Sequence, residues 1–324
     1  MQIYLDTYGA SLTVQNGAWC VRASKEAASH LFSAEEVSVI FLSKSVMVST
    51  DALLLGIANS VPILLLDARN RPAGQVWSGK YGSISTIRKQ QALWSGQIDA
   101  LIWVRNNLIL PKVEAQLAHL KTLPTRITRA ETVLTKIVTQ IEQYTLDSWH
   151  DKAADTLRGY EGTASRHYFG ALALNLPMTM RFDKRSTNPA TDAFNAALNY
   201  AYGILYGLVE VALLKSGIDP SLGVLHTDRY AQPTFVYDFI EPYRIWADEV
   251  LMQLCCTDTL CLTHFETLPD ASIRISKEGR RIIVAAFLKH TEGLITIKRV
   301  SRQRITHIDL AAARLATLLK TWQK

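Results

Sequence analysis

The sequence predicts an α+β protein with a small, β-sandwich-like N-terminal domain followed by a larger, mainly α-helical domain. Short runs rich in Val, Ile and Tyr alternate with turn residues as far as about Trp77. From about Ile84 onward, apolar residues instead recur every three or four positions. With 324 residues the chain is long enough for two cores. Residues 77–83 are rich in small residues, so we expect domains at 1–83 and 84–324.

The first domain is expected to consist of short strands and one helix. The helix lies between Ser49 and Ser60, with Thr50 or Asp51 as its N-cap, and Pro62 opens the strand that follows. The expected strands are residues 3–5, 11–14, 19–21, 37–42, 46–49 and 63–66.

The second domain is expected to be bundle-like. Its most apolar run, residues 196–214, contains Asn199 and Glu210, which favours a buried core helix over a membrane span. The stretches 272–275 and 282–287 suggest an excursion from the bundle, followed by a closing amphipathic helix at 310–319. The other helical patterns cover residues 93–110, 113–120, 127–146, 171–176 and 192–214.

The charge distribution is compatible with a nucleic-acid partner. The net charge is +6 and the pI about 9.1. Between Ala271 and Arg304 there are nine Lys or Arg residues and only two Glu residues, whereas the first hundred residues are nearly neutral. Such a cluster suits a polyphosphate, because neutralising phosphates releases counterions. A solvated helix face would have the same composition, so charge alone leaves both interpretations open.

Cysteine usage indicates a reducing compartment. The four cysteines lack disulfide-scaffold spacing, and the N-terminus does not resemble a signal peptide, so we expect a cytoplasmic protein. A partial zinc site at Cys255, Cys261 and His264 has no fourth ligand at a normal spacing, which favours free thiols.

The first candidate for chemistry is the stretch from Tyr160 to Phe169. In a helix, Glu161, Ser165 and Tyr168 fall on one face. A buried carboxylate needs a partner, so Glu161 requires an explanation. It is either a functional residue or a helix N-terminal Glu stabilised by the helix dipole.

The second candidate is His226, which ends the apolar run Gly223–Thr227 just before a polar, turn-like stretch. A histidine in this position is either a metal ligand or, more commonly, a hydrogen-bonded residue of a core or loop.

The third candidate is the stretch from Pro233 to Arg244. Thr234 is expected to cap a helix on which Asp238 and Glu241 are neighbours, and Pro242 is expected to kink it. Adjacent carboxylates repel unless one of them is neutral or a cation lies between them. That cation is either a metal ion or the guanidinium of Arg244.

Together these segments resemble the CRISPR-associated integrase family, the nuclease of spacer-acquisition complexes. The matching blocks occur in family order and the resemblance covers nearly the whole chain, with the first domain matched more loosely. The blocks are Glu161–Ser165 with Tyr168 and Phe169, Pro189–Tyr202, Gly217–Pro220, Gly223–His226 and Tyr237–Arg244, flanked by residues 37–67 and 276–281.

The resemblance implies that Glu161, His226 and Glu241 are the catalytic metal ligands. Asp238 matches a further acidic position, as a supporting residue or an additional ligand. A set of carboxylates and one imidazole suits Mn²⁺ or Mg²⁺. Such an ion would stabilise charge on a phosphodiester under attack by water or by a 3′-hydroxyl. No nucleotide cofactor is needed, because transesterification exchanges one phosphodiester for another.

Basic and aromatic residues near these segments are candidates for DNA contact. Arg can grip phosphate through two hydrogen bonds. Trp77, Tyr160 and Tyr168 could stack on bases, although aromatic residues at helical spacing belong to the core more often. The candidate cations are Lys80, Arg88, Arg158, Arg166, Arg181, Lys184, Arg185, Arg229 and Arg244.

The resemblance also implies the partners: double-stranded DNA, namely prespacer and CRISPR repeat, a small companion protein, and a second copy of the chain contacted through domain 1–83. No membrane partner is expected. Two other functions remain open, namely a general nuclease for branched or repair-type DNA and a non-catalytic DNA-binding scaffold.

Overall fold

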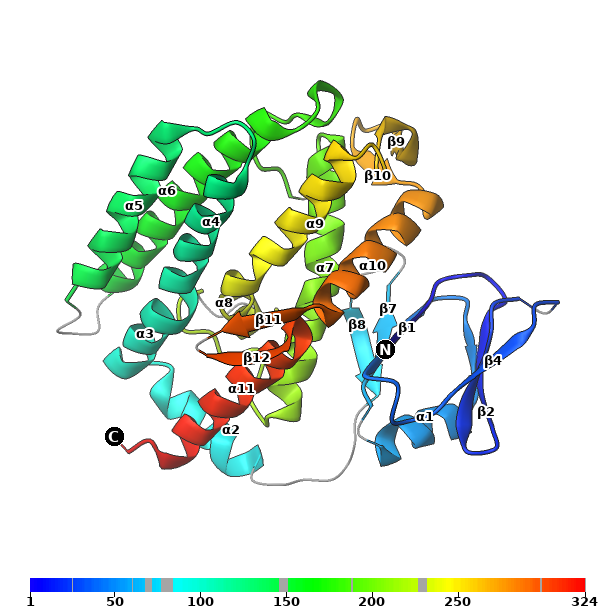
Figure 1. The fold of residues 1–324 in the computed structure, drawn as a ribbon. Coiled ribbons are helices and arrows are strands. Elements are labelled where there is room, and N and C mark those ends of the chain that lie inside the picture. Colours follow the sequence, from blue (N-terminus) through cyan, green and yellow to red (C-terminus); the bar gives the residue numbers. More distant parts are fainter. Residues whose placement is uncertain are drawn as a thin grey trace. The chain divides into compact units, whose positions relative to one another are not determined.

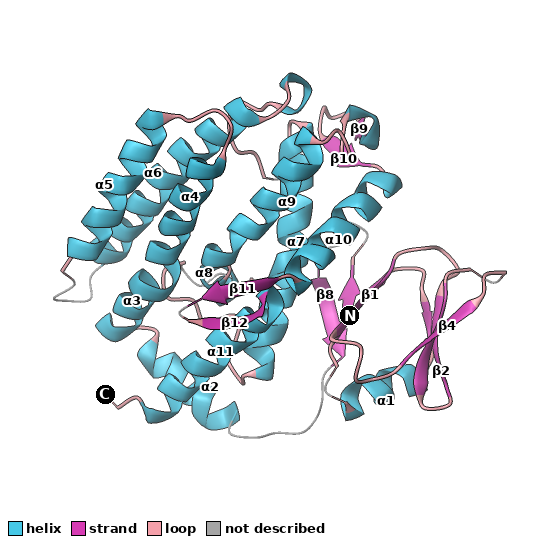
Figure 2. Cartoon of the chain, in the orientation of Figure 1, coloured by secondary structure: helices cyan, strands magenta, loops and turns pink. Residues whose placement is uncertain are grey.

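The computed structural model describes residues 1–24, 26–59, 61–67, 72–76, 84–145, 151–187, 189–226, 232–297 and 299–323. The chain forms two compact units, Met1–Gly82 and Ser83–Lys324. The stretch 77–83, interpreted above as a linker, lies outside the described residues. Strands are concentrated in the first unit and helices in the second, which confirms the predicted α+β class (Figures 1 and 2).

The first unit contains two four-stranded sheets and the helix α1 (Thr50–Ala58). One sheet has the order β1 (Gln2–Leu5), β5 (Val39–Ser43), β7 (Ile63–Leu66) and β8 (Pro72–Val76), in which the first three strands are parallel and β8 is antiparallel. The other has the order β4 (Ser29–Phe32), β3 (Ala18–Arg22), β2 (Ser11–Gln15) and β6 (Met47–Val48). Strands β4 and β8 were not predicted from the sequence.

A single core joins the two sheets to α1. Leu12 and Trp19 from one sheet and Ile40 from the other belong to the same buried cluster. The indole Nε1 of Trp19 also donates to the carbonyl of Ala52 at 3.0 Å. The predicted N-cap was wrong by one or two residues, because the side chain of Ser49 accepts from the amide of Ala52. A serine oxygen is as good a cap as the residues that follow it.

The second unit is built from helices and two hairpins. The hairpins pair β9 (Phe265–Thr267) with β10 (Ile273–Ile275) and β11 (Leu294–Ile297) with β12 (Val300–Gln303). A π-helical turn, Arg105–Ile109, joins α3 to α4. The helices are α2 (Ile84–Trp94), α3 (Ile98–Val104), α4 (Leu110–Thr122), α5 (Thr128–Gln143), α6 (Asp151–Asn175), α7 (Ala193–Lys215), α8 (Thr234–Phe239), α9 (Arg244–Cys256), α10 (Lys277–Glu292) and α11 (Arg304–Thr321).

Helix packing places the candidate functional site, described below, between two groups of helices. Helices α4, α5 and α6 lie side by side, and α9 packs against both α4 and α7 (Figure 1). Helix α7 is long and apolar enough to cross a membrane, but 72% of its most apolar window is buried within the protein. It is therefore a core helix, as the sequence predicted.

Candidate active site

A pocket of about 470 Å³ brings together residues from all three candidate segments. Glu161 comes from α6, His226 from the loop after α7, and Glu241 from the 3₁₀ turn Glu241–Tyr243 that precedes α9. The remaining lining residues include Lys112, Gln116, Ser165, Arg166, Phe169, Lys184, Arg185, Tyr202, Arg244 and Asp248. The predicted convergence of Glu161, His226 and Glu241 on one cavity is therefore present in the fold.

Glu161 lies in the middle of a helix. Helix α6 begins at Asp151, so the alternative of a helix N-terminal Glu stabilised by the dipole was wrong. The hydroxyl of Ser165 donates to Glu161 Oε1 at 2.8 Å, and the ammonium of Lys112 pairs with the same oxygen. Burial would raise the pKa of Glu161, but Lys112 and Ser165 together hold it below its ordinary value.

Glu241 is buried and paired with two cations. The ammonium of Lys112 contacts Oε2, and Nη2 of Arg244 lies 3.1 Å from Oε1. Pro242 was expected to kink the helix, and it lies in the 3₁₀ turn Glu241–Tyr243 that separates α8, which stops at Phe239, from α9, which starts at Arg244. The ion pair between Glu241 and Arg244 anticipated from their spacing is thus present, and a second cation accompanies it.

Asp238 holds the loop that carries His226. Its Oδ2 accepts from the amides of Val224 and Leu225 at 2.7 and 2.9 Å. Its Oδ1 accepts from the amide of His226 at 3.0 Å and lies 2.6 Å from the ring Nδ1. With Nδ1 bound to a carboxylate, Nε2 is the ring nitrogen left for a ligand, the usual arrangement of metal-binding histidines.

The hydrogen bond that Nδ1 of His226 donates to Asp238 is the main reason that the pKa of His226 is raised, with burial opposing it. The side chain of His226 is 43% exposed, whereas that of Asp238 is fully buried. Asp238 is therefore placed to orient the imidazole, and both of its oxygens are already engaged.

Two neighbouring residues fix the same loop. Thr234 was expected to be an N-cap, but Pro233 occupies that position, and the Thr234 hydroxyl donates to the carbonyl of Ser221 at 2.5 Å. At Gly223, an added Cβ would lie 2.5 Å from the carbonyl oxygen of His226. Only glycine fits there, since the clash would be with backbone.

Lys112 is the site residue that sequence reasoning missed. It lies on α4, is buried, and places its ammonium between Glu161 and Glu241. Burial would lower its pKa, but the two carboxylates raise it above the ordinary value. The available signal was a lysine between the apolar residues Pro111 and Val113, where a solvated charge is not expected.

The residue types at the pocket fit a hard divalent cation. Carboxylate oxygens and an imidazole are the donors that Mn²⁺ and Mg²⁺ take. The buried Oε1 of Gln116, one turn after Lys112, has no hydrogen-bond partner among the described residues. Across the described residues, however, no three His, Cys, Asp or Glu side chains converge closely enough to hold a metal ion. The ammonium of Lys112 takes the place between the two carboxylates.

A buried aromatic and carboxylate cluster forms the wall behind these groups. The hydroxyls of Tyr202 and Tyr168 hydrogen-bond to Asp248, the former at 2.7 Å. Burial raises the pKa of Asp248 to about 6. Two guanidinium groups stack over the ring of Tyr202, at 5.8 Å for Arg185 and 4.8 Å for Arg244. The cluster thus holds two cations at the pocket.

Only some of the predicted DNA-contacting residues lie at the pocket. Arg166, Lys184, Arg185 and Arg244 line the pocket. Arg158 instead bonds the carbonyl of Leu225, and Arg181 bonds carbonyls at the end of α6. Arg88 lies exposed on α2. Lys80, Arg229 and Trp77 lie outside the described residues.

The aromatic residues considered for base stacking have different environments. Tyr168 is fully buried and bonded to His119 at 2.8 Å, so it belongs to the core. Tyr160 contacts Tyr144 edge-on, with ring centroids 6.2 Å apart.

The basic cluster of residues 271–304 lies elsewhere, on β10, α10 and the β11–β12 hairpin. None of its described cations lines the pocket. Several of them bond to the backbone or to surface carboxylates, for example Arg274 to Glu266 at 2.6 Å.

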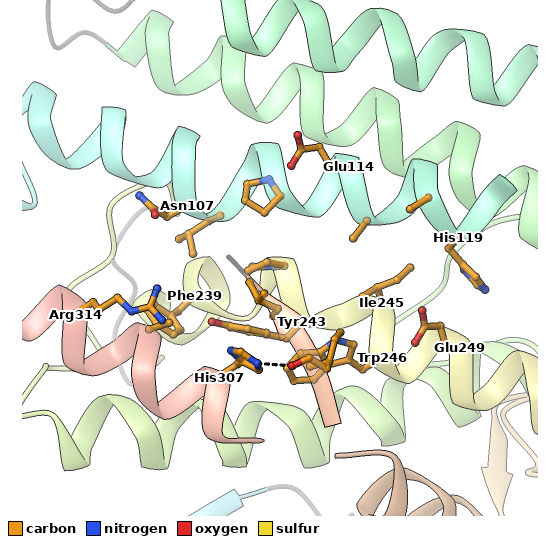
Figure 3. Close-up of a pocket in the computed structure, with 18 of the residues that line it drawn as sticks. Asn107, Glu114, His119, Phe239, Tyr243, Ile245, Trp246, Glu249, His307 and Arg314 are labelled. Atoms are coloured by element: carbon orange, nitrogen blue, oxygen red, sulfur yellow. Dashed lines mark hydrogen bonds between the residues drawn. The ribbon is translucent and has the colours of Figure 1, made fainter. Parts of the chain in front are cut away.

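A second pocket, of about 570 Å³, lies between α4, α9, β11 and α11 (Figure 3). Phe239, Tyr243 and Trp246 line it, and Nε2 of His307 lies 2.9 Å from the carbonyl oxygen of Ile295 at its edge (Figure 3). It shares helices with the polar pocket but few residues.

The β unit, the helical unit and the charged pocket define an α+β protein with the residue types of a phosphodiester-processing enzyme. The family described as CRISPR associated protein Cas1 matches residues 3–289. The chain belongs to this family, which confirms the resemblance inferred from its motifs.

Individual relatives agree with this assignment. The CRISPR-associated endonuclease Cas1 1 of Archaeoglobus fulgidus is 25% identical over 311 residues, which is 90% of this chain and 89% of that protein. Two solved structures share the fold. A casposase bound to integration product has a TM-score of 0.82 at 19% identity, over 100% of this chain and 91% of that one. The Cas6-RT-Cas1–Cas2 complex has 0.77 at 20% identity, over 98% and 35%.

Proposed function

We propose that this chain is a metal-dependent DNA endonuclease and integrase that inserts short DNA fragments into a CRISPR array. The observation that carries the proposal is the single pocket shared by Glu161, His226 and Glu241, beside anchored arginines. Relatives named as Cas1 endonucleases support the reaction class. Attack of a fragment's 3′-hydroxyl on a repeat phosphodiester would exchange one ester for another.

Glu161, His226 and Glu241 would hold Mn²⁺ or Mg²⁺, with Asp238 orienting His226. When bound, such an ion supplies Lewis-acid stabilisation of the phosphoryl oxygens and lowers the pKa of the attacking hydroxyl. Asp238 fixes the imidazole before substrate arrives, so no free energy is lost in orienting it later.

The cations around the pocket would bind and orient DNA. Arg185 and Arg244 are fixed by stacking on Tyr202, so they can stabilise charge on the phosphate under attack without first becoming ordered. Arg166 and Lys184 are exposed at the same pocket and are suited to phosphates of the flanking backbone.

Double-stranded DNA, as prespacer and CRISPR repeat, is the proposed substrate, and the cytoplasm is the proposed location. The Cas6-RT-Cas1–Cas2 complex, which shares this fold, supports a small companion protein as partner. A homodimer formed through the N-terminal unit would supply one site for each end of a fragment.

The test is a strand-transfer assay with prespacer-like duplex and a supercoiled plasmid bearing a repeat. Glu161→Ala and His226→Ala are expected to abolish joined products while changing DNA affinity less than about fivefold, because neither side chain is among the proposed phosphate contacts. Cleavage without joining would favour the general branched-DNA nuclease. DNA binding with neither product in the unmodified protein would favour the scaffold.

A further inference from the structure

Lys112 is the group that couples the two proposed acidic ligands. Glu161 and Glu241 come from elements 80 positions apart in sequence, and the ammonium of Lys112 bonds to one oxygen of each. Only 6% of Lys112 is exposed, so its charge is compensated by these carboxylates and not by water.

The remaining contacts of the two carboxylates also come from the protein. Ser165 donates to Glu161 Oε1, and Arg244 lies against Glu241 Oε1. A divalent ion held between Glu161 and Glu241 would take the position that the ammonium of Lys112 has between one oxygen of each. It would also lie within a few ångströms of the ammonium, where repulsion between buried like charges is strong.

We propose that Lys112 is an internal competitor for the divalent cation: it holds Glu161 and Glu241 together in the metal-free protein and is displaced when the ion binds. The inference rests on the proposed function, because it takes these carboxylates as metal ligands. Its consequence is that the free protein binds metal more weakly than its donor set would allow.

The decisive experiment measures Mn²⁺ affinity by electron paramagnetic resonance of the free ion. Lys112→Met keeps most of the length of the side chain and removes its charge. We expect Mn²⁺ to bind this variant about tenfold more tightly, or better, since the competing charge is gone.

Two variants serve as matched controls. Lys112→Arg keeps a cation at this position and is expected to bind Mn²⁺ no more tightly than the unmodified protein. Lys184→Met removes a lysine from the same pocket that is exposed to solvent, and is expected to change the affinity less than about threefold, because solvent screens it. Equal gains in Mn²⁺ affinity for Lys184→Met and Lys112→Met would overturn the inference, since the gain would then come from losing any positive charge at the pocket.

Thermal unfolding reports on the other half of the proposal. Without metal, Lys112→Met is expected to melt at a lower temperature than the unmodified protein, because two buried carboxylates lose their shared cation. Mn²⁺ should raise its melting temperature by more than it raises that of the unmodified protein.

A measurement on the unmodified protein covers the case in which Lys112→Met does not fold. Acetic anhydride labels accessible lysines, and mass spectrometry reads each position. Labelling of Lys112 should be low without metal and should rise on adding Mn²⁺; unchanged labelling at saturating Mn²⁺ would refute displacement.

Failure of the inference and failure of the proposed function are distinguishable. If the unmodified protein and a Glu161→Gln, Glu241→Gln double variant bind Mn²⁺ equally, the metal assignment itself fails. If only the double variant loses Mn²⁺ but Lys112→Met gains nothing, the metal site stands and the competitor role is rejected.

Discussion

Two pockets of the helical unit, one polar and one apolar, are lined by different residues of the same elements. On α4, Lys112 lines the polar pocket, whereas the adjacent Pro111 lines the apolar one. In the 3₁₀ turn, Glu241 faces the first pocket, and Pro242 and Tyr243 face the second. Stability and chemistry are thus separated by helix face and not by domain, because successive residues of a helix point in different directions.

The two faces differ in how they affect folding. The apolar pocket is lined mainly by apolar and aromatic side chains, whose burial stabilises the fold, with Glu114, Glu249 and Arg314 also among its lining residues (Figure 3). The polar pocket buries charges whose desolvation opposes folding and which stabilise it only as partners of one another. A buried series of hydrogen-bonded side chains connects the two pockets, running from His119 through Tyr168 to Asp248.

The largest expected effect is on the apolar side and affects stability alone. Trp246 is 3% exposed, so Trp246→Ala should lower the free energy of unfolding by about 3–5 kcal/mol. Strand transfer per folded molecule should stay within about threefold, since no group of the polar pocket is removed. Urea unfolding and an assay normalised to folded protein check this. Leu294→Ala, at a residue 73% exposed, is the control and should cost less than about 0.5 kcal/mol.

The next effect concerns the charge buried between the pockets. Burial raises the pKa of Asp248 to about 6 from an ordinary 3.8. Between these values the folded protein holds a proton that the unfolded chain has released, so stability falls as the pH rises through this window. The loss is on the order of 3 kcal/mol and is complete above about pH 6.

Asp248→Asn cannot release this proton. Subtracting its stability curve from that of the unmodified protein between pH 4 and 7 should isolate the decline. Parallel curves would mean that Asp248 titrates normally and that its burial does not raise its pKa.

A smaller effect tests whether Asp238 positions His226. Asp238→Asn keeps the shape but replaces one acceptor oxygen by a donor that faces backbone amides. Strand transfer should fall about 10–100-fold, the usual cost of losing such an orienting partner. Asp219→Asn is the matched control, since Asp219 bonds Ser221 in the same loop without lining the pocket. Equal losses in both variants would indicate that the loop matters only as a whole.

The smallest effect is at the rim of the polar pocket. Lys184→Ala should weaken duplex binding a few fold and reduce the slope of log affinity against log salt by about 1, as loss of one phosphate contact requires. Fluorescence anisotropy over a salt series measures both. Lys136→Ala, at an exposed lysine on α5, should leave the slope unchanged.

Local patterns predicted much of the fold and the segments of the site. Short apolar runs separated by turn residues identified β2, β3 and β7, and helical periodicity identified α5, α7 and α11. Polar residues in apolar runs drew attention to the segments that contain Glu161, His226 and Glu241. The family resemblance then implied that these three residues are the ligands. Strands β4 and β8 were missed, since the exposed residues of the first and the proline and glycine of the second weaken any strand pattern.

Local patterns could not predict which groups the charged side chains bond to. Arg158 and Arg181 have the composition of phosphate-binding residues, yet both bond carbonyl groups of their own unit. Asp238 and Glu241 are three residues apart and were treated as sharing a cation, but Asp238 bonds the His226 loop and Glu241 the cation of Lys112.

The sequence by itself determined the α+β class, the core helix α7, the family and the three segments that meet in one pocket, because each of these depends on local periodicity or on contiguous motifs. Only the tertiary structure placed Lys112, 49 residues from Glu161 and 129 from Glu241, between the two carboxylates. The physical reason is that helix packing decides which distant charges become neighbours, and the π-helical turn before α4 interrupts the periodicity from which its buried face could have been extrapolated.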